Sequence, residues 1–373
     1  MSKVRGADPP KLDTAKLRKP QSSEGGSDPV VTTAKVEAYS SSKLPIVNPL
    51  TVWTNQDLPS EKLAWLQEQI LPHILVQTNA SAVNNLTAGG QDESCTTADI
   101  AFGQPSVEDL LAPNSLKWIH ITSAGFTRYD REDLGSTLKA AGTPFTNSSA
   151  VYDDPCAQHT MAMILCHNRQ ILPSHRCHQN HEWSYNKLRP IERVLGNENI
   201  LIVGYGAIGV RLTELLKPFG CNIRGIRRTP QGNEPISTFP IADLHRHLSW
   251  ADHVVNLLPA GPSTEKLFDT GTFNQMQPHA AFYNVGRGDT VNQEALISAL
   301  NKSKIAAAYL DVTTPEPLPA DHPLWDAQNC FITPHVAGGM QNEMDVLVDH
   351  FLANFRRFIA NEPLKDIVRT LGK

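Results

Sequence analysis

Short apolar runs alternate with amphipathic stretches from about residue 46 onward, and this rhythm predicts an α/β protein. Residues 61–70 have the apolar spacing of a helix with one buried face, whereas 74–77 and 118–122 are short apolar runs typical of strands. A longer apolar-rich stretch covers residues 155–172 and starts with Pro155, a residue suited to the first turn of a helix. We interpret this stretch as a helix that links two domains.

From residue 199 the apolar strands and the intervening helices alternate strictly, as in a parallel doubly wound sheet. The expected strands cover 200–203, 223–226, 254–258, 280–284, 306–311 and 331–333, and the clearest helices run to 219 and over 293–300. A last helix places Met344, Phe351 and Phe358 on one face and must pack on a sizeable partner, for which the first domain is the natural candidate.

A chain of 373 residues is longer than one hydrophobic core normally supports, so we expect two domains. We predict a Rossmann-type doubly wound parallel sheet domain over residues 151–337. A flavodoxin-like, discontinuous substrate domain is expected over residues 45–150, completed by residues 338–373. Residues 1–44 are rich in Ser, Pro, Gly, Lys and Thr and are predicted to be a disordered tail, whose basic residues leave organelle import open.

The composition narrows the class of protein. Hydrophobic residues make up 40% and charged residues 19%, as in soluble globular proteins. The net charge of -5 gives no basic stripe for nucleic acid or for an acidic membrane surface, so neither is an expected partner. Six cysteines without a CxxC pair indicate reduced thiols, and we expect a cytoplasmic protein. We expect no metal, since the spacing of the neighbouring polar residues fits no common zinc pattern; these are His167, His175, Cys177, His178 and His181.

A glycine-rich loop follows the strand at 200–203 and precedes a helix. Its residues are Gly204, Tyr205, Gly206, Ala207, Ile208 and Gly209, which match the GxGxxG pattern. The first glycine permits the tight turn, the second lets a pyrophosphate approach the backbone, and the third lets helix and strand pack closely. The phosphates would then lie at the helix N-terminus, so the loop predicts a dinucleotide site.

The end of the next strand indicates which dinucleotide binds. NAD-dependent proteins usually place an acidic residue there to bind the ribose 2'-hydroxyl, but this chain has Arg227, Arg228 and Thr229. Two guanidinium groups suit a 2'-phosphate, so we predict NADP(H), with NAD(H) as the alternative cofactor. A solvated pair of charges on a loop is the structural alternative.

Three further segments follow predicted strand ends, where an open α/β sheet binds its ligands. They are Asn-Val-Gly-Arg-Gly at 284–288, the stretch from Leu-Asp-Val to Pro-Glu-Pro-Leu-Pro at 310–319, and Thr-Pro-His-Val-Ala-Gly at 333–338. From about Ile121 to the C-terminus, their order and spacing resemble the D-isomer-specific 2-hydroxyacid dehydrogenases. The resemblance implies that Arg287 binds the substrate carboxylate and polarises the ketone, that His335 is the general acid/base, and that Glu316 holds its imidazole.

These residue types suit the reduction of a 2-keto acid. Hydride addition creates an alkoxide that needs a proton, which a histidine, with an ordinary pKa of about 6.5, can supply near neutral pH. A paired carboxylate favours the imidazolium form and fixes its tautomer. The planar fork of Arg287 suits a carboxylate. Each residue also has a structural interpretation on its own, but their joint occurrence after the glycine loop favours catalysis.

The resemblance also implies further contacts. Ser123, Ala124 and Gly125 fall where the family has a loop whose backbone N–H groups bind the substrate carboxylate, although many members have Gly-Ala-Gly there. Outside the glycine loop and the arginine pair, the expected cofactor-binding residues are Leu258, Pro259, Thr264, Val285, Gly286, Asp311, His335 and Gly338.

We therefore expect NADPH-dependent reduction of a small 2-keto acid, such as glyoxylate or hydroxypyruvate, to the D-2-hydroxy acid, and the reverse reaction. The resemblance implies a homodimer built on the cofactor domains. We interpret Trp183 as a buried aromatic residue; the alternative is a position that reaches across the dimer toward the neighbouring active site.

Two other functions share this architecture. Formate dehydrogenase pairs its acid/base His with Gln, so Glu316 argues against it. The C-terminal binding protein corepressors use the fold as a dinucleotide-sensing scaffold and keep the catalytic residues. The cofactor distinguishes this alternative, because an NAD(H)-sensing scaffold should have an acidic residue in place of Arg227.

Overall fold

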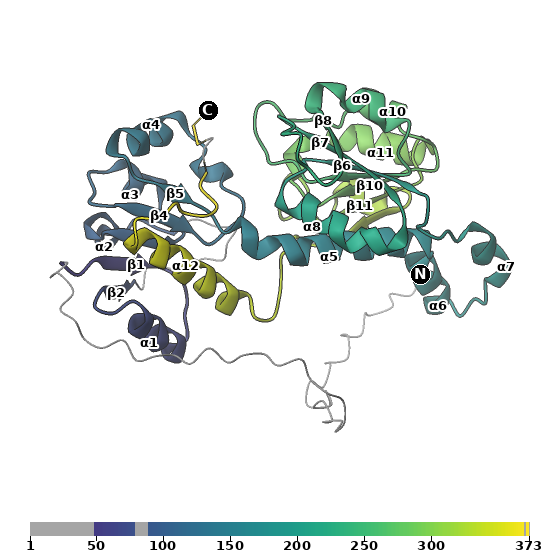
Figure 1. The fold of residues 1–373 in the computed structure, drawn as a ribbon. Helices are drawn as coiled ribbons and strands as arrows, with labels where there is room; N and C mark the ends of the chain where they lie inside the picture. The colour runs from purple at the N-terminus through teal and green to yellow at the C-terminus, as the bar shows by residue number, and fades with distance from the viewer. Residues whose placement is uncertain (1–47, 79–88, 369–370, 373) are drawn as a thin grey trace, which may run out of the picture. The chain divides into compact units, whose positions relative to one another are not determined.

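The computed structural model describes residues 48–78, 89–368 and 371–372. The predicted disordered tail, residues 1–44, lies outside these ranges. The described residues form two sheets, of five and seven strands, in which every strand pair is parallel (Figure 1). None of the helices among the described residues has the length and apolar character needed to span a membrane.

The first sheet has the strand order β2-β1-β3-β4-β5. Its strands are β1 (Thr51–Thr54), β2 (Ile74–Gln77), β3 (Ile100–Gly103), β4 (Trp118–Ile121) and β5 (Phe145–Thr146), and the helices between them are α1 (Ser60–Gln69), α2 (Glu93–Thr97), α3 (Val107–Leu111) and α4 (Glu132–Ala141). The central strands β3 and β4 are buried along their whole length, as apolar strands between helical layers should be.

The second sheet has the order β12-β11-β10-β9-β6-β7-β8, and it confirms the predicted Rossmann-type α/β fold. Its strands are β6 (Asn199–Val203), β7 (Asn222–Arg227), β8 (Ser237–Pro240), β9 (His253–Asn256), β10 (Ala281–Asn284), β11 (Ala307–Leu310) and β12 (Cys330–Ile332), and its helices include α8 (Ala207–Leu216), α9 (Leu244–Leu248), α10 (Thr270–Gln275) and α11 (Gln293–Asn301). The strand order reverses between β6 and β9. Loops at such a switch point form the ligand crevice of an open α/β sheet.

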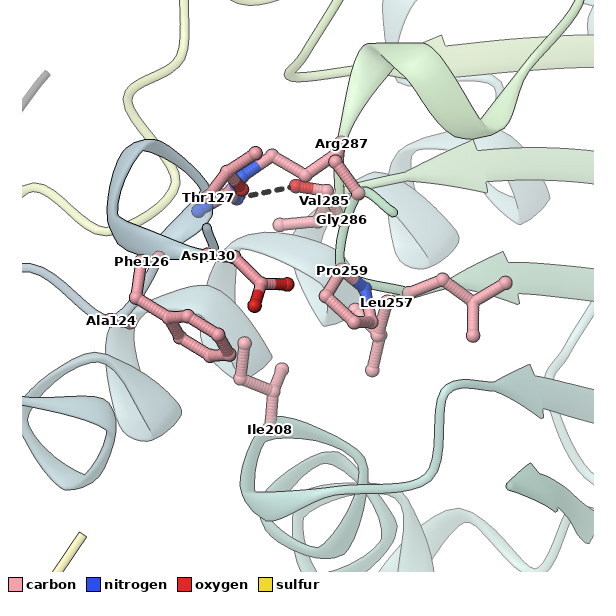
Figure 2. A pocket seen from close by; sticks show the side chains of 13 residues that line it. Ala124, Phe126, Thr127, Asp130, Ile208, Leu257, Pro259, Val285, Gly286 and Arg287 are labelled. Carbon is pink, nitrogen blue, oxygen red and sulfur yellow. Dashed lines mark hydrogen bonds between the residues drawn. The ribbon is translucent and has the colours of Figure 1, made fainter. Parts of the chain in front are cut away.

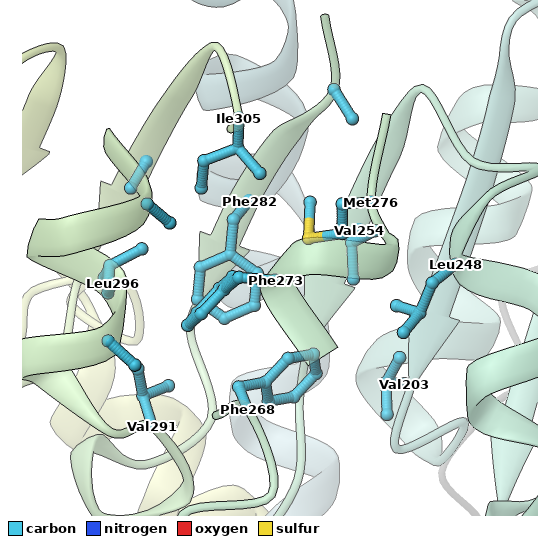
Figure 3. Close-up of a cluster of buried hydrophobic side chains, with 14 of the residues drawn as sticks. Val203, Leu248, Val254, Phe268, Phe273, Met276, Phe282, Val291, Leu296 and Ile305 are labelled. Atoms are coloured by element: carbon cyan, nitrogen blue, oxygen red, sulfur yellow. The ribbon is translucent and has the colours of Figure 1, made fainter. Parts of the chain in front are cut away.

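The core of the second sheet explains why its strands have continuous apolar runs. Phe282 on β10 packs against Phe268 and against Phe273 of α10, with ring centroids 4.8 and 5.3 Å apart (Figure 3). Tyr283, the next residue, is fully buried in a second apolar cluster, where it stacks on Tyr309 of β11. Successive strand residues thus enter cores on opposite faces, and each large apolar side chain contributes about 1.5–3 kcal/mol.

The prediction that the linker helix starts at Pro155 is wrong. Helix α5 covers Ser149–Asn168, so Pro155 lies inside the helix and does not open it. The proline leaves the carbonyl of Val151 without a helical N–H donor. Packing compensates, because Val151 and Tyr152 are buried in the core and the Tyr152 hydroxyl donates to the carbonyl of Thr122 at 2.9 Å. The apolar stretch also continues into a second helix, α6 (Ile171–Gln179).

The interpretation of Trp183 as a buried residue is also wrong. Trp183 lies between α6 and α7 (Tyr185–Leu188), and 94% of its surface is exposed. Neither helix has a buried residue, so this segment has no core of its own to receive an indole ring. Nearby apolar side chains are exposed as well; they are Ile171, Tyr185, Ile191 and Val194.

The last helix, α12 (Glu343–Ile359), packs on the first sheet although it follows the second sheet in sequence. Phe351 stacks on Phe102 of β3 and on Trp118 of β4, with ring centroids 4.2 and 5.4 Å apart. Val348 and Phe355 belong to the same buried cluster. The C-terminal part of the chain therefore completes the hydrophobic core of the first sheet.

Candidate active site

The glycine loop lies between β6 and α8, at the switch point of the second sheet. Gly204 has a φ of +94°, and a Cβ there would lie 2.7 Å from the carbonyl carbon of Leu257, so a larger residue would not fit. The backbone N–H groups of Gly204 and Tyr205 both donate to the carbonyl of Ile226, at 2.8 and 2.9 Å. Gly206 then caps α8, whose first N–H groups have no partner within the helix. This geometry fits the pyrophosphate of a dinucleotide.

Tyr205 and Gly209 pack beneath the glycine loop, on the side of the hydrophobic core. The Tyr205 ring is 2% exposed, and its hydroxyl donates to Thr213 at 3.3 Å, so the side chain belongs to the core. A Cβ on Gly209 would lie 3.0 Å from that ring and 3.2 Å from Ile202, which explains the close approach of helix and strand. Of the predicted cofactor residues, Tyr205 can therefore offer only its backbone to a ligand.

The arginine pair lies at the carboxyl end of β7. Arg227 donates from Nη1 to Oε1 of Glu234 at 2.8 Å, and its side chain is 28% exposed. Arg228 and Thr229 are exposed. The strand end that normally receives the adenosine ribose thus has two guanidinium groups, one held by a carboxylate and one open to solvent.

A pocket of about 140 Å³ lies where the loops after β4, β9 and β10 meet the start of α8 (Figure 2). The predicted residues in its lining are Ala124, Gly125, Ile208, Leu258, Pro259, Val285, Gly286 and Arg287, and the unpredicted ones are Phe126, Thr127, Asp130, Leu257 and Ala260. The carboxylate of Asp130 points into the pocket near Phe126 and Pro259. The pocket therefore joins the predicted carboxylate-binding loop with the arginine predicted to bind the same substrate.

Arg287 is held in place by close backbone contacts on both sides. A Cβ on Gly288 would lie 2.0 Å from the carbonyl oxygen of Thr313, and one on Gly286 would lie 2.6 Å from that of Leu258. The guanidinium donates from Nη1 to the Gly286 carbonyl at 2.6 Å, and a Cβ on Gly125 would lie 1.8 Å from Nη2. Burial lowers the pKa of Arg287, an effect that Glu316 opposes, and the group stays charged at neutral pH.

His335 and Glu316 form the predicted acid–carboxylate pair. Nδ1 of His335 and Oε2 of Glu316 are 2.7 Å apart, and Oε1 of Glu316 accepts a hydrogen bond from the Thr313 N–H at 2.9 Å. Burial raises the pKa of Glu316, but these two hydrogen bonds and the charge of Arg287 outweigh it and lower that pKa. The three predicted catalytic side chains are thus linked electrostatically, although only Arg287 lines the pocket.

Asp311 holds the loop that carries His335. Its Oδ1 accepts hydrogen bonds from the Thr333 hydroxyl at 2.6 Å and the Val336 N–H at 3.0 Å, and its Oδ2 accepts from the Ala337 N–H at 2.9 Å. The His335 N–H donates to the Asp311 carbonyl at 2.8 Å, with a φ of 54° at His335. The buried carboxylate therefore fixes a backbone conformation that a non-glycine residue rarely adopts.

Other predicted residues use their side chains for support. The Ser123 hydroxyl donates to the Gly125 carbonyl at 2.7 Å, and the Thr264 hydroxyl donates to the Pro259 carbonyl at 2.7 Å. A Cβ on Gly338 would lie 3.0 Å from the Tyr152 ring. Ser123 and Thr264 thus shape the loops around the pocket, and the structure places neither in its lining.

Sequence reasoning missed Phe126, Thr127 and Asp130, which follow Gly125 directly in one loop. Their position after the predicted carboxylate-binding loop was the available signal. Metal ligands are not grouped in this region: within the described ranges, no three His, Cys, Asp or Glu side chains gather to hold an ion.

Comparison with known proteins agrees with this geometry. Residues 161–337 match the family model described as D-isomer specific 2-hydroxyacid dehydrogenase, NAD binding domain. A protein of Corynebacterium melassecola, described as an uncharacterized protein in the proB 3'region, is 32% identical over 305 residues, which are 79% of this chain and 95% of that protein. The glyoxylate reductase/hydroxypyruvate reductase of Mus musculus is 34% identical over 229 residues, or 59% of this chain and 69% of that protein. A solved D-isomer specific 2-hydroxyacid dehydrogenase from Xanthobacter autotrophicus Py2, in complex with NADPH and MES, has a TM-score of 0.72 and 26% identity, and the match covers 86% of this chain and 98% of that one.

Proposed function

We propose that this chain, which belongs to the D-isomer-specific 2-hydroxyacid dehydrogenase family, reduces a small 2-keto acid to the D-2-hydroxy acid with NADPH and catalyses the reverse reaction. The hydrogen bond of 2.7 Å between His335 and Glu316 carries the proposal, because it orients an acid/base group for a carbonyl oxygen. Glyoxylate and hydroxypyruvate are the proposed substrates. The name of the mouse relative and the small pocket around Arg287 and Gly125 support this choice.

Each residue of the site has a defined task in the proposed reaction. Arg287 and the backbone N–H groups near Gly125 bind the substrate carboxylate, and Arg287 polarises the ketone. When bound, the nicotinamide supplies the hydride that adds to the carbonyl carbon. His335 gives a proton from Nε2 to the carbonyl oxygen, because Glu316 engages Nδ1 and thereby fixes the tautomer. In the reverse direction the same nitrogen removes the hydroxyl proton.

The cofactor preference rests on the end of β7. Arg227 and Arg228 provide charge for a 2'-phosphate, and no acidic residue occupies these two positions to accept hydrogen bonds from a ribose hydroxyl. The NADPH complex of the Xanthobacter autotrophicus structure supports the same choice. NADH is the expected weaker substrate.

We also propose the organisation around this chemistry. Residues 151–337 bind the dinucleotide, and residues 45–150 with 338–373 form the substrate domain. The exposed apolar side chains on and around α6 and α7, Trp183 among them, form part of a homodimer interface. We expect the dimer to act in the cytoplasm on small acids, with neither nucleic acid nor membrane as a partner.

The test is turnover with purified protein. NADPH or NADH is mixed with a panel of 2-keto acids that includes glyoxylate and hydroxypyruvate, and the absorbance of the reduced nicotinamide is followed. We expect NADPH oxidation with at least one acid, and its loss in His335→Gln. Tight cofactor binding without turnover of any acid would instead favour the dinucleotide-sensing scaffold.

A further inference from the structure

Glu234 holds Arg227 through a carboxylate that the turn after β7 surrounds. Its Oε1 accepts hydrogen bonds from Arg227 Nη1 and from the Gln231 N–H, each at 2.8 Å, and its Oε2 accepts from the Gly232 N–H at 2.9 Å. The side chain of Thr238 also lowers the pKa of this carboxylate. Only 6% of the Glu234 side chain is exposed, compared with 28% of Arg227. The carboxylate is therefore a fixed anchor for a more accessible guanidinium.

These contacts prevent Glu234 from binding a ribose hydroxyl. A carboxylate has about four lone-pair positions; donors on Arg227, Gln231 and Gly232 take three of them, and only 6% of the side chain is exposed. The Gln231 N–H, followed by the other donors, lowers the pKa of Glu234 to about 2, so the group stays ionised at neutral pH. An acidic residue close to Arg227 thus does not restore the hydroxyl recognition typical of NAD-dependent proteins.

Arg227 keeps most of its hydrogen-bonding capacity. A guanidinium has five N–H donors in a planar fork, and Glu234 accepts from one nitrogen, Nη1. Because this contact restricts a long flexible side chain before a ligand arrives, less conformational entropy is lost on binding. Arg228, which is exposed beside it, adds positive charge that balances the negative charge of Glu234.

We propose that Glu234 is a positioning residue for cofactor selection, which fixes the Arg227 guanidinium at the end of β7 so that its remaining donors meet the 2'-phosphate of NADPH. This inference rests on the NADPH preference proposed above. Glu234 acts through Arg227 and touches neither the substrate nor the nicotinamide. Its loss should therefore change the affinity for NADPH and leave the chemical step unchanged.

The test compares Glu234→Gln and Glu234→Ala with the unmodified chain. Dissociation constants for NADPH and NADH are measured by quenching of tryptophan fluorescence without keto acid, and KM and kcat are measured separately. We expect Glu234→Gln to weaken NADPH binding by about tenfold, with NADH binding changed by less than about twofold and kcat unaltered. Glu214→Gln is the matched control, because Glu214 accepts a hydrogen bond of 2.8 Å from Arg211 on the exposed face of α8. Glu214→Gln should change neither the dissociation constant for NADPH nor that for NADH.

Several outcomes would overturn the inference. Unchanged or tighter NADPH binding in Glu234→Gln would show that the carboxylate does not help Arg227, and equal weakening of both cofactors would indicate a purely structural role. If the unmodified chain prefers NADPH and Arg227→Gln abolishes that preference while Glu234→Gln does not, only the inference about Glu234 fails. An unmodified chain without NADPH preference refutes the proposed cofactor, and this inference with it.

A further variant keeps the test decisive if the Glu234 variants do not fold. Thr238→Val removes a side chain that stabilises the ionised Glu234 carboxylate and leaves both Glu234 and Arg227 in place. It should weaken NADPH binding alone, by less than the loss of the carboxylate, and an unchanged NADPH constant would again overturn the inference.

Discussion

Replacing Glu316 by Gln should slow keto-acid reduction by about fourfold, through its effect on His335. The distance of 2.7 Å between His335 Nδ1 and Glu316 Oε2 is typical of a charge-assisted hydrogen bond. Such a bond contributes about 1.5–3 kcal/mol, and a neutral amide acceptor retains roughly half of that. The expected loss is therefore about 0.75–1.5 kcal/mol. Because the two side chains are 26% and 33% exposed, solvent screening places it near the lower end, at about 0.8 kcal/mol, which is about a factor of four.

A double-mutant cycle measures whether Glu316 acts through the imidazole. His335→Gln alone should reduce kcat/KM by about 10²- to 10⁴-fold, the usual contribution of a general acid. The double variant should be no slower than His335→Gln, because Glu316 has no imidazole left to orient.

The reasoning is refuted if the two single losses multiply in the double variant, because Glu316 would then contribute independently of His335. An unchanged kcat/KM in Glu316→Gln would refute it as well. His279→Gln is the control: His279 Nε2 lies 2.7 Å from Asp252 Oδ1, outside the lining of the pocket, and its loss should not affect the reduction.

Three further predictions concern single positions. Gly125→Ala should raise the KM for the keto acid with little change in melting temperature, because the added Cβ would displace only the end of the Arg287 side chain. An unchanged KM would contradict the proposed contact of Arg287 with the substrate carboxylate. Asp311→Asn should lower the free energy of unfolding by about 1–3 kcal/mol and reduce kcat, because a buried acceptor of three hydrogen bonds is replaced. Urea unfolding and steady-state kinetics measure the two effects. Unchanged values of both would contradict the role of Asp311 as support for the His335 loop. Glu234 has a pKa of about 2 in the folded chain, below its ordinary value of 4.5, so it adds stability above about pH 4.5 that is lost as the pH falls toward 2. In Glu234→Gln, the free energy of unfolding should therefore depend less on pH between about 2 and 4.5. An unaltered pH dependence in that range would contradict the lowered pKa of Glu234.

The parts of the site that the sequence predicted are those whose chemistry is local. The glycine loop needs particular backbone conformations at Gly204 and close packing at Gly209, and these requirements appear directly as glycines. His335 and Glu316 belong to strand-end segments that a parallel sheet brings to one edge. Their hydrogen bond was expected from the resemblance to the family, and the topology explains why the two segments meet.

The errors came from interactions between distant segments. The start of α5 depends on the burial of Val151 and Tyr152, and this burial outweighs the preference of Pro155 for the first turn of a helix. Trp183 has an apolar side chain, but no neighbouring element of the described chain covers it. Glu234 reaches Arg227 through a turn whose geometry no periodicity encodes. Local propensity cannot supply such information, because tertiary packing decides it.

The contact between Gly288 and Thr313 has a consequence for how the enzyme could change its substrate. A Cβ at position 288 would overlap the Thr313 carbonyl, and the N–H of the same Thr313 donates to Glu316. A side chain at position 288 would thus disturb Arg287, which is proposed to bind the substrate carboxylate. It would also disturb the hydrogen bond that holds Glu316 beside His335. Evolution of new specificity must therefore leave these contacts intact and proceed at other residues of the pocket lining, such as Phe126.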